Sequence, residues 1–324
     1  MPLPDVYARV TDKIVADLER GMRPWMKPWS GDQTATGEII RPLRHNGVPY
    51  RGVNVLLLWG EAMERGFCSA IWMTFNQAKE LSAHVRKGEH GSLVVYANTF
   101  TKTETDTATG AEIEKTIPFM KGYTVFNVEQ IDGLPPHYYA KTDPPPEPKT
   151  RREARLELFF RAANATVRHG GNRAFYSVST DAIQMPPFIA FKDAEGYYAT
   201  LAHELTHWTR HPSRLDRDFG RKQWGDEGYA KEELVAEMGA AFLCADLGIT
   251  PEVREDHAAY VASWLKVLKG DNRAIFSAAA HAQRAADYLH SLQPQPEAQP
   301  DPIPAPAEPT EPRVLVAGLQ ANAL

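Results

Sequence analysis

Two proline-dense stretches limit how this 324-residue chain can fold. The first is LPPHYYAKTDPPPEPK at 134–149, and the second begins at Pro294 with PQPEAQPDPIPAPAEPTEP. Proline has no amide hydrogen and fixes its own backbone angle, so neither stretch suits a helix or a sheet ladder. We therefore predict folded domains at 1–133 and 150–292, separated by a linker at 134–149 and followed by a disordered tail over 293–324.

The composition excludes several classes of protein. The net charge is −5, so any affinity for nucleic acid must come from a local patch. Two cysteines, Cys68 and Cys244, are too few for a disulfide scaffold and suit a reducing cytosol. The N-terminus carries acids where a signal peptide would be apolar, and the run VNVLLLW is too short to span a bilayer. These features predict a cytoplasmic protein with no membrane partner.

The first domain, 1–133, combines helical and strand patterns. Apolar residues recur at helical spacing between Val6 and Leu18, and a second helix is predicted at 75–84. The segments 92–100 and 121–131 are rich in residues that favour strands. The polar stretch between them contains a turn signal at Thr109-Gly110 and predicts a hairpin.

The second domain is expected to place short strands before a series of helices. A helix is predicted at 151–168, followed by strands at 174–180 and 186–193. Later helices are predicted at 198–210 and 229–247, with two more reaching residue 292. Strands followed by a helix with the HExxH pattern and a further helix are the order of a zincin-type hydrolase. The fold class is therefore predicted to be α+β, with the second domain gluzincin-type.

The segment LAHELTHWTRH at 201–211 contains the HExxH pattern. His203 and His207 are four residues apart and share a helix face, so both imidazoles can reach one ion at about 2.0–2.1 Å. Glu204 lies one residue round the helix and can reach a water on that ion as a general base. The alternative is a surface helix that carries two ordinary histidines.

A further histidine, His211, lies at the same helical spacing but does not suit the same ion. The helix rise places it about 12 Å from His203 along the axis, too far for two ligands of one metal. The metzincin pattern requires glycine at 210 and histidine at 213, where this chain has Arg210 and Ser213. We predict that His211 is a residue of the helix C-terminus.

A third ligand is predicted on the helix at 229–247. Glu233 and Glu237 are four residues apart and share a face with Ala240 and Ala241, whose small size would allow close packing against the HExxH helix. Gluzincins pair a glutamate ligand with an acid four residues later, which predicts Glu233 as ligand and Glu237 as its outer partner. The reverse assignment remains open, as does the alternative that both acids only solvate a helix face.

Two histidines and one carboxylate favour zinc over magnesium or calcium, although other divalent transition metals remain possible. The remaining coordination position would be open to water, as catalytic sites require. Such an ion lowers the pKa of bound water toward about 7, and Glu204 would take its proton. Candidates for stabilising the developing oxyanion are Tyr197, Tyr198, Tyr229 and Arg210.

Basic and aromatic residues are interleaved in the first domain. Cations can follow the phosphates of a single strand while aromatic faces stack on its bases. The candidate DNA-binding residues are Arg23, Trp25, Lys27, Trp29, Arg44, Tyr50, Arg51, Arg86 and Lys87. The alternative is structural, because tryptophans in the context PWMKPW often pack against neighbouring prolines.

Several long segments resemble a known family. RPLRHNGVPYRGVNVLLLW, SAIWMTFNQAKELSAHVRKGEHGSLVVY and YTVFNVEQIDGLP resemble the N-terminal domain of ArdC-type antirestriction proteins, which some plasmid primases share. HELTHWTRHPSRLDRDFG and YAKEELVAEMGAAFL resemble the zincin-like metallopeptidase domain that is fused to it. The resemblance covers about residues 5–290, and it lacks a primase catalytic region. Many relatives have glycine where this chain has Arg210.

This resemblance implies a module that binds single-stranded DNA and a metallopeptidase fold with His203, Glu204 and His207 at its metal motif. It also implies a role in protecting transferred plasmid DNA from host restriction. Two alternatives remain: a protein that only shields DNA around a structural metal, and a cytosolic peptidase whose first domain recruits a protein substrate. Whether a restriction enzyme is the substrate, and the oligomeric state, remain open.

Overall fold

The computed structural model describes residues 5–25, 40–105, 112–139, 149–220, 226–249 and 257–294. Some predictions concern residues outside these ranges: Lys27, Trp29, the turn at Thr109-Gly110, most of the linker at 134–149 and the tail beyond Pro294. Met1–Gln293 form one compact unit, and both halves of the sequence contribute to it.

Three helices organise the N-terminal half. In α1, Val6–Glu19, the Asp5 side chain accepts a hydrogen bond from the Tyr7 amide. The predicted apolar stripe is buried from Val10 to Leu18, and Val6 is half-buried. The apolar run VNVLLLW forms α2, Val53–Arg65, which ends where Gly66 takes a left-handed conformation. Helix α3, Phe75–Glu80, is shorter than predicted.

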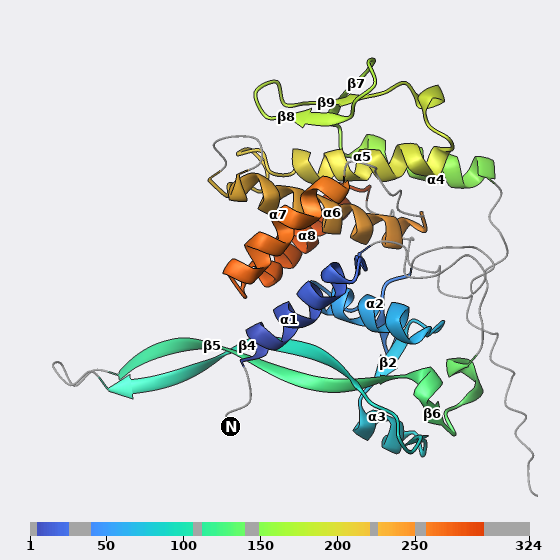
Figure 1. Cartoon of the computed structure of the whole chain (residues 1–324), viewed down its shortest axis with the longest axis vertical. Coiled ribbons are helices and arrows are strands. Elements are labelled where there is room, and N and C mark those ends of the chain that lie inside the picture. Colours follow the sequence, from blue (N-terminus) through green and yellow to red (C-terminus); the bar gives the residue numbers. More distant parts are fainter. Residues whose placement is uncertain are drawn as a thin grey trace, which may run out of the picture. The chain divides into compact units, whose positions relative to one another are not determined.

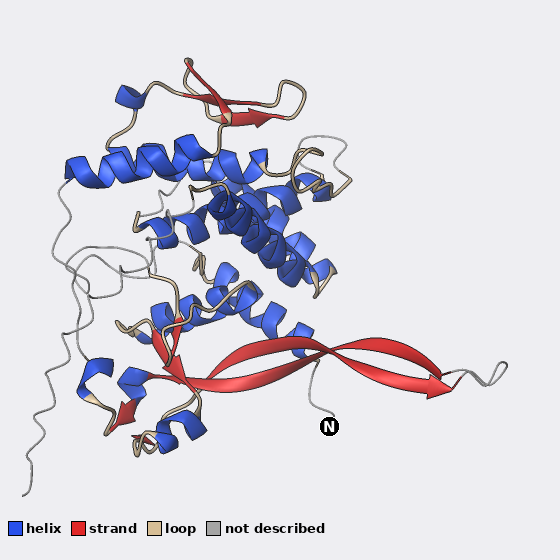
Figure 2. Ribbon diagram, turned by 180° about the vertical axis from the view of Figure 1, so that it is seen from behind, coloured by secondary structure: helices blue, strands red, loops and turns tan. Residues whose placement is uncertain are grey.

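The sheet of this half has the order β1-β2-β5-β4 (Figure 1). The short strands β1, Leu43–Arg44, and β2, Ile71–Met73, pair in parallel, and β2 pairs with the end of β5, Glu112–Asn127. Strand β4, Ser92–Thr105, runs antiparallel to β5 over its whole length. The predicted hairpin is therefore confirmed, and Figure 2 shows it as a long twisted ribbon that continues beyond β2.

The first residues of the predicted linker are packed against the N-terminal half. Strand β3, His84–Val85, pairs with β6, Ile131–Asp132, after a short 3-10 turn at Val128–Gln130. A second 3-10 turn at Pro136–Tyr138 follows. Leu134 and Tyr138 are buried in a small cluster with Met73 and Ile131, so the packed structure extends into the stretch predicted as a linker. Residues 140–148 of that stretch lie outside the described ranges.

The C-terminal half begins with helix α4, Lys149–Ala162, and a three-stranded sheet. Its strands are β7, Thr166–His169, β8, Phe175–Ser177, and β9, Ala182–Met185, in the order β7-β9-β8. The helix predicted at 151–168 therefore ends early, and its last residues form β7. The strand predicted at 186–193 is instead a 3-10 turn at Phe188–Ala190, because the preceding Pro186-Pro187 cannot donate to a ladder.

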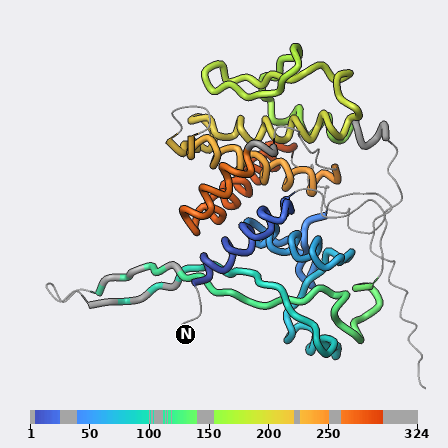
Figure 3. Tube along the Cα trace, viewed as in Figure 1, coloured from blue at the N-terminus to red at the C-terminus, as the bar shows by residue number. Residues whose placement is uncertain are grey.

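Four helices complete this half: α5, Ala194–Trp208, α6, Glu227–Leu247, α7, His257–Gly270, and α8, Ala274–Ser291. Helix α6 packs against both α5 and α8, as the trace in Figure 3 shows. Helix α5 begins four residues earlier than predicted because the Asp193 side chain accepts a hydrogen bond from the Gly196 amide at 2.8 Å. Helix α6 ends at Gly248, as predicted.

The two halves share a hydrophobic core. The ring of Trp59 in α2 lies 6.0 Å from that of Phe242 in α6. Buried Arg41 donates to Asp246 of α6 and, at 2.9 Å, to Gln283 of α8. Both halves therefore bury residues in the same large hydrophobic core, and the buried ion pair adds a polar contact between them. This shared burial stabilises each half.

Candidate metal centre and nucleic-acid surface

Close packing between α5 and α6 positions the candidate metal ligands. A Cβ atom placed on Gly239 of α6 would lie 2.5 Å from Cγ2 of Thr206 in α5, which is closer than real Cβ atoms approach. Small residues were predicted to allow this packing at Ala240 and Ala241, of which Ala241 is buried and Ala240 is partly buried. The structure adds Gly239, where α6 closely approaches Thr206 of α5.

We expect Gly239→Ala to lower the free energy of unfolding by about 1–3 kcal/mol, because the new methyl group must push α5 and α6 apart. Thermal unfolding followed by circular dichroism would measure the change. Gly270→Ala in α7 is the matched control, since a Cβ there meets nothing within 4 Å. Equal stability of the two variants would contradict the close approach.

Three side chains converge between these helices. Donor atoms of His203, His207 and Glu233 all lie within 4.8 Å of one another. Oε2 of Glu233 lies 3.6 Å from Nε2 of His203, and Oε1 of the same carboxylate lies 3.5 Å from Nε2 of His207. One carboxylate therefore faces the Nε2 atoms of both imidazoles, which is the arrangement that a single ion between them requires.

Two more glutamates of α6 lie behind the imidazoles. Oε1 of Glu237 is 3.5 Å from Nδ1 of His203, and Oε1 of Glu232 is 3.0 Å from Nδ1 of His207. Outer carboxylates of this kind fix the tautomer and orientation of ligand histidines. The arrangement favours Glu233 over Glu237 as the ligand, and it gives Glu232 a role that the sequence analysis did not assign.

Arg217 holds Glu232 in place. Its guanidinium is buried and donates two hydrogen bonds of 2.8 Å to the Glu232 carboxylate. Burial acts to raise the pKa of Glu232, but the hydrogen bonds from Arg217 and His207 outweigh it and lower the pKa to about 2. Because ionised Glu232 can only accept, Nδ1 of His207 donates to it, and Nε2 of the same ring faces Glu233.

The carboxylates around His207 create an electrostatic potential that favours positive charge on its ring. Burial acts to lower the pKa of His207, yet Glu233 and Glu232 raise it to about 10. Burial likewise acts against ionisation of Glu233, but His207 and His203 lower its pKa. Two imidazole nitrogens and one ionised carboxylate in a largely buried pocket form a donor set that suits a divalent transition metal. Glu204 is buried on α5, adjacent in sequence to His203.

His211 lies outside this group, as predicted. Helix α5 ends at Trp208, and Nδ1 of His211 lies 2.8 Å from the hydroxyl of Ser213. Together with the geometry of Glu233, this places the third candidate donor on α6 instead of on the HExxH segment.

Among the four candidates for oxyanion stabilisation, Tyr229 interacts with Glu233. Burial and the nearby Glu233 carboxylate raise the pKa of Tyr229, and its hydroxyl lies 2.9 Å from that of Tyr260. The hydroxyls of Tyr197 and Tyr198 instead contact residues of β7 and α4. Tyr229 is therefore the protonated hydroxyl best placed to donate near the candidate metal ligands.

Two aromatic residues predicted to stack on DNA are part of the core. Trp25 is 1% exposed and packs edge-on against Trp264, with 5.7 Å between the ring centroids. Tyr50 is 8% exposed, and the Arg44 guanidinium lies over its ring. Neither ring offers a face to a base, so the structural alternative describes Trp25 and Tyr50 better than the DNA-binding interpretation does.

Several of the predicted DNA-binding cations form ion pairs within the protein. Arg51 pairs with Asp287 of α8, and Arg86 pairs with Glu89 and Asp132. Arg23 is partly buried. Arg44 and Lys87 are exposed, and both stay candidates for contact with DNA.

Helices long and apolar enough to cross a bilayer do not occur in the described part of the chain.

Comparison with known proteins identifies the families that share this architecture. Residues 4–126 match the N-terminal domain of the anti-restriction factor ArdC, and residues 154–281 match zincin-like metallopeptidases. The metal-free crystal structure of antirestriction protein ArdC from plasmid R388 is 49% identical, with a TM-score of 0.73, and the match covers 89% of this chain and 97% of that one. The chain belongs to the ArdC antirestriction family.

Other relatives extend this result. The Mn(II)-bound structure of the R388 protein matches with 46% identity and a TM-score of 0.71, over 89% of this ArdC-family chain and 98% of that one. The uncharacterized protein y4eC of Sinorhizobium fredii is 42% identical over 89% of this chain and 92% of its own length. DNA primase TraC of Escherichia coli is 40% identical, and the matched region is 27% of that primase.

Proposed function

We propose that this protein binds single-stranded DNA and protects transferred plasmid DNA from restriction in the cytosol, and that its zincin-like half hydrolyses a peptide bond. The position of Glu233 is the observation that supports the proposed hydrolysis. Its carboxylate faces Nε2 of both His203 and His207, while Glu232 and Glu237 lie behind the two rings.

The residues present fit a metal-dependent hydrolase. His203, His207 and Glu233 would hold zinc or another divalent transition metal, which when bound supplies Lewis acidity toward water and a carbonyl oxygen. The R388 relative is described in an Mn(II)-bound form, which supports the proposal that this chain also binds a divalent metal.

The chain's own groups provide the proton transfers. Glu204 would accept a proton from the attacking water and pass it to the leaving amine. Tyr229, kept protonated by its raised pKa, would donate a hydrogen bond to the developing oxyanion. Glu232 and Glu237 would hold the imidazoles in the orientation that presents Nε2.

The function is tested by measuring binding and protection with the full chain. We expect a fluorescently labelled single strand to bind with an affinity that falls as salt rises, since phosphate contacts release counterions. Expression in a recipient cell should raise the transfer of an unmodified plasmid past a restriction system. Absence of single-strand binding at low salt would instead favour the interpretation as a peptidase whose first half recruits protein.

A further inference from the structure

An aromatic patch lies on one face of the β4–β5 ribbon. It consists of Tyr96 in β4 and Phe119 and Tyr123 in β5. The Tyr96 ring centroid is 6.1 Å from that of Phe119 and 6.2 Å from that of Tyr123. Tyr96 pairs with Lys121, so Phe119 and Tyr123 occupy the two diagonal positions on the same face. Tyr96 and Tyr123 are 47% and 45% exposed, which leaves much of their surface in contact with solvent.

Among the described residues, the part of the ribbon that carries this patch is formed by β4 and β5 alone. Strand β2 pairs with β5 at Phe126 and Asn127, beyond the patch. A two-stranded ribbon has little capacity to bury large rings, so exposed aromatics there need another reason. Figure 2 shows the ribbon continuing past the rest of the sheet.

Two cations without an ion pair within the described residues lie at the level of the patch. Lys121 is exposed, and its Nζ is 5.7 Å from the centroid of the Phe119 ring. Arg9 of α1 lies over the other side of the ribbon, where its Nη1 would be 3.7 Å from a Cβ atom on Gly122. Gly122 stands between Lys121 and Tyr123 in β5, so Lys121 shares the face of the aromatic patch, whereas Arg9 lies at the same level on the opposite face.

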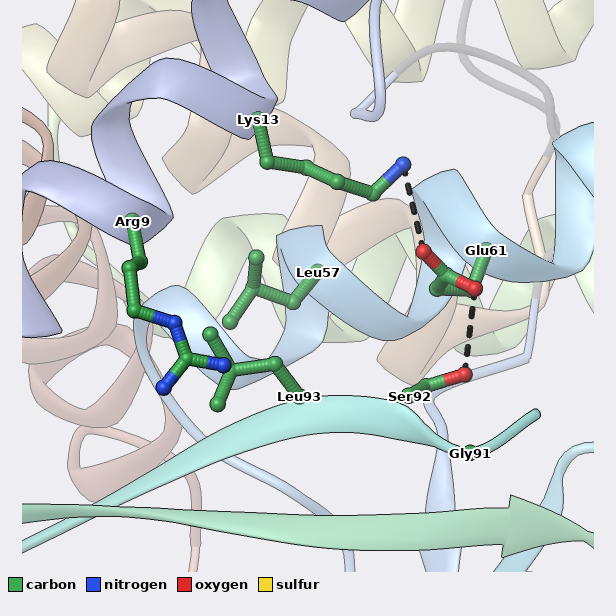
Figure 4. Close-up of a pocket in the computed structure, with 7 residues that line it drawn as sticks. All are labelled: Arg9, Lys13, Leu57, Glu61, Gly91, Ser92 and Leu93. Atoms are coloured by element: carbon green, nitrogen blue, oxygen red, sulfur yellow. Dashed lines mark hydrogen bonds and ion pairs between the residues drawn. The ribbon is translucent and has the colours of Figure 1, made fainter. Parts of the chain in front are cut away.

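Arg9 also lines a cavity of about 340 Å³ between α1, α2 and the start of β4 (Figure 4). Lys13 lines the same cavity, but its charge is balanced by Glu61 at 3.2 Å and Glu64 at 2.8 Å. Figure 4 shows Lys13 directed toward Glu61, while Arg9 reaches toward Leu93. Arg9 therefore adds positive charge to the face of the ribbon that is turned away from the aromatic patch.

We propose that the aromatic patch, with Lys121, is the surface on which this protein binds single-stranded nucleic acid. The inference rests on the proposed function and names its binding site. Exposed rings stack on bases of any sequence, and Lys121 on the same face contacts a phosphate between them. Glu112 and Glu114 lie exposed at the far end of the ribbon. Because they repel phosphates, they favour binding at the aromatic patch over binding at that end.

The test measures the affinity of the full chain for a labelled oligothymidylate of about 20 nucleotides at several salt concentrations. Tyr96→Ala and Tyr123→Ala should each weaken binding by about 5- to 100-fold with little change in the salt slope. Lys121→Gln should reduce the salt slope by about 0.7, because it removes one phosphate contact, whereas Arg9→Gln on the opposite face should leave the slope close to that of the wild type. Tyr96→Leu keeps an apolar side chain on the ribbon and should bind as weakly as Tyr96→Ala.

Matched controls are Phe175→Ala and Phe188→Ala, since these rings are 49% and 50% exposed in the other half of the chain. Both should bind like the wild type. If the wild type binds and all patch variants bind equally well, the inference is overturned while the proposed function stands. Binding to a duplex of equal length with the same dependence on the rings would also overturn it. If the wild type binds no single strand, the proposed function fails and this inference fails with it.

Discussion

Glu204→Gln is expected to abolish protection against restriction while the metal and single-strand binding remain. Glutamine keeps the size and polarity of the side chain, and Glu204 is not among the three converging donors. It cannot accept a proton from water, and the loss of a general base lowers a rate by about 10²- to 10⁴-fold. The measurement is plasmid transfer into restricting and non-restricting recipients that express each variant.

Glu227→Gln provides the matched control, because Glu227 is exposed in the first turn of α6. This variant should protect as well as the wild type. Metal content and DNA affinity of Glu204→Gln should equal those of the wild type, so that loss of protection is assigned to chemistry. Full protection by Glu204→Gln would show that catalysis is not the mechanism and would favour a protein that only shields the incoming strand.

The second large effect is expected at Arg217. Its replacement by methionine removes both hydrogen bonds to Glu232 and leaves a carboxylate that is 1% exposed without its charged partner. Breaking a buried ion pair in this way costs about 3–5 kcal/mol of unfolding free energy. Chemical denaturation would measure the loss, and affinity for the metal should fall as well, because Glu232 orients His207.

Arg161→Met is the control for the Arg217 experiment. Arg161 pairs with Glu157 at 2.8 Å, but both side chains are largely exposed, and such a pair contributes about 0–1 kcal/mol. If Arg217→Met were as stable as Arg161→Met, the buried Arg217–Glu232 pair would not contribute to the fold as the structure indicates.

The sequence predicted those parts of the candidate site that depend on local geometry. His203 and His207 share a helix face because of their spacing, and Glu233 and Glu237 do so on the next helix. The partner of Glu232 could not be found in this way, because Arg217 lies on the chain between the two helices and meets Glu232 only after they pack. No spacing rule encodes such a contact.

The predicted DNA-binding residues show a different limit of prediction from sequence. A mixture of cations and aromatics near Trp25 has the same composition whether the rings are exposed or buried. Trp25 is buried because α7 supplies Trp264, a residue distant in sequence, as its packing partner. In the ribbon the hairpin itself was predictable, but the exposed face at Tyr96 and Tyr123 depends on where the third strand stops.

Boundaries of elements depended on capping and on proline. Helix α5 begins earlier than predicted because the side chain of Asp193 caps it, one turn before the apolar pattern starts. The strand predicted at 186–193 does not form because two prolines stand at its beginning. Both signals were present in the sequence.

The central claim is that His203, His207 and Glu233 hold one metal ion, and metal analysis of three purified proteins tests it most directly. The wild type should contain about one divalent ion per chain, and Glu233→Ala should contain almost none. Glu237→Ala should keep the ion with an affinity lowered by about 10- to 100-fold, as the loss of an outer partner predicts. Loss of the ion in Glu237→Ala with retention in Glu233→Ala, or no ion in the wild type, would contradict the claim.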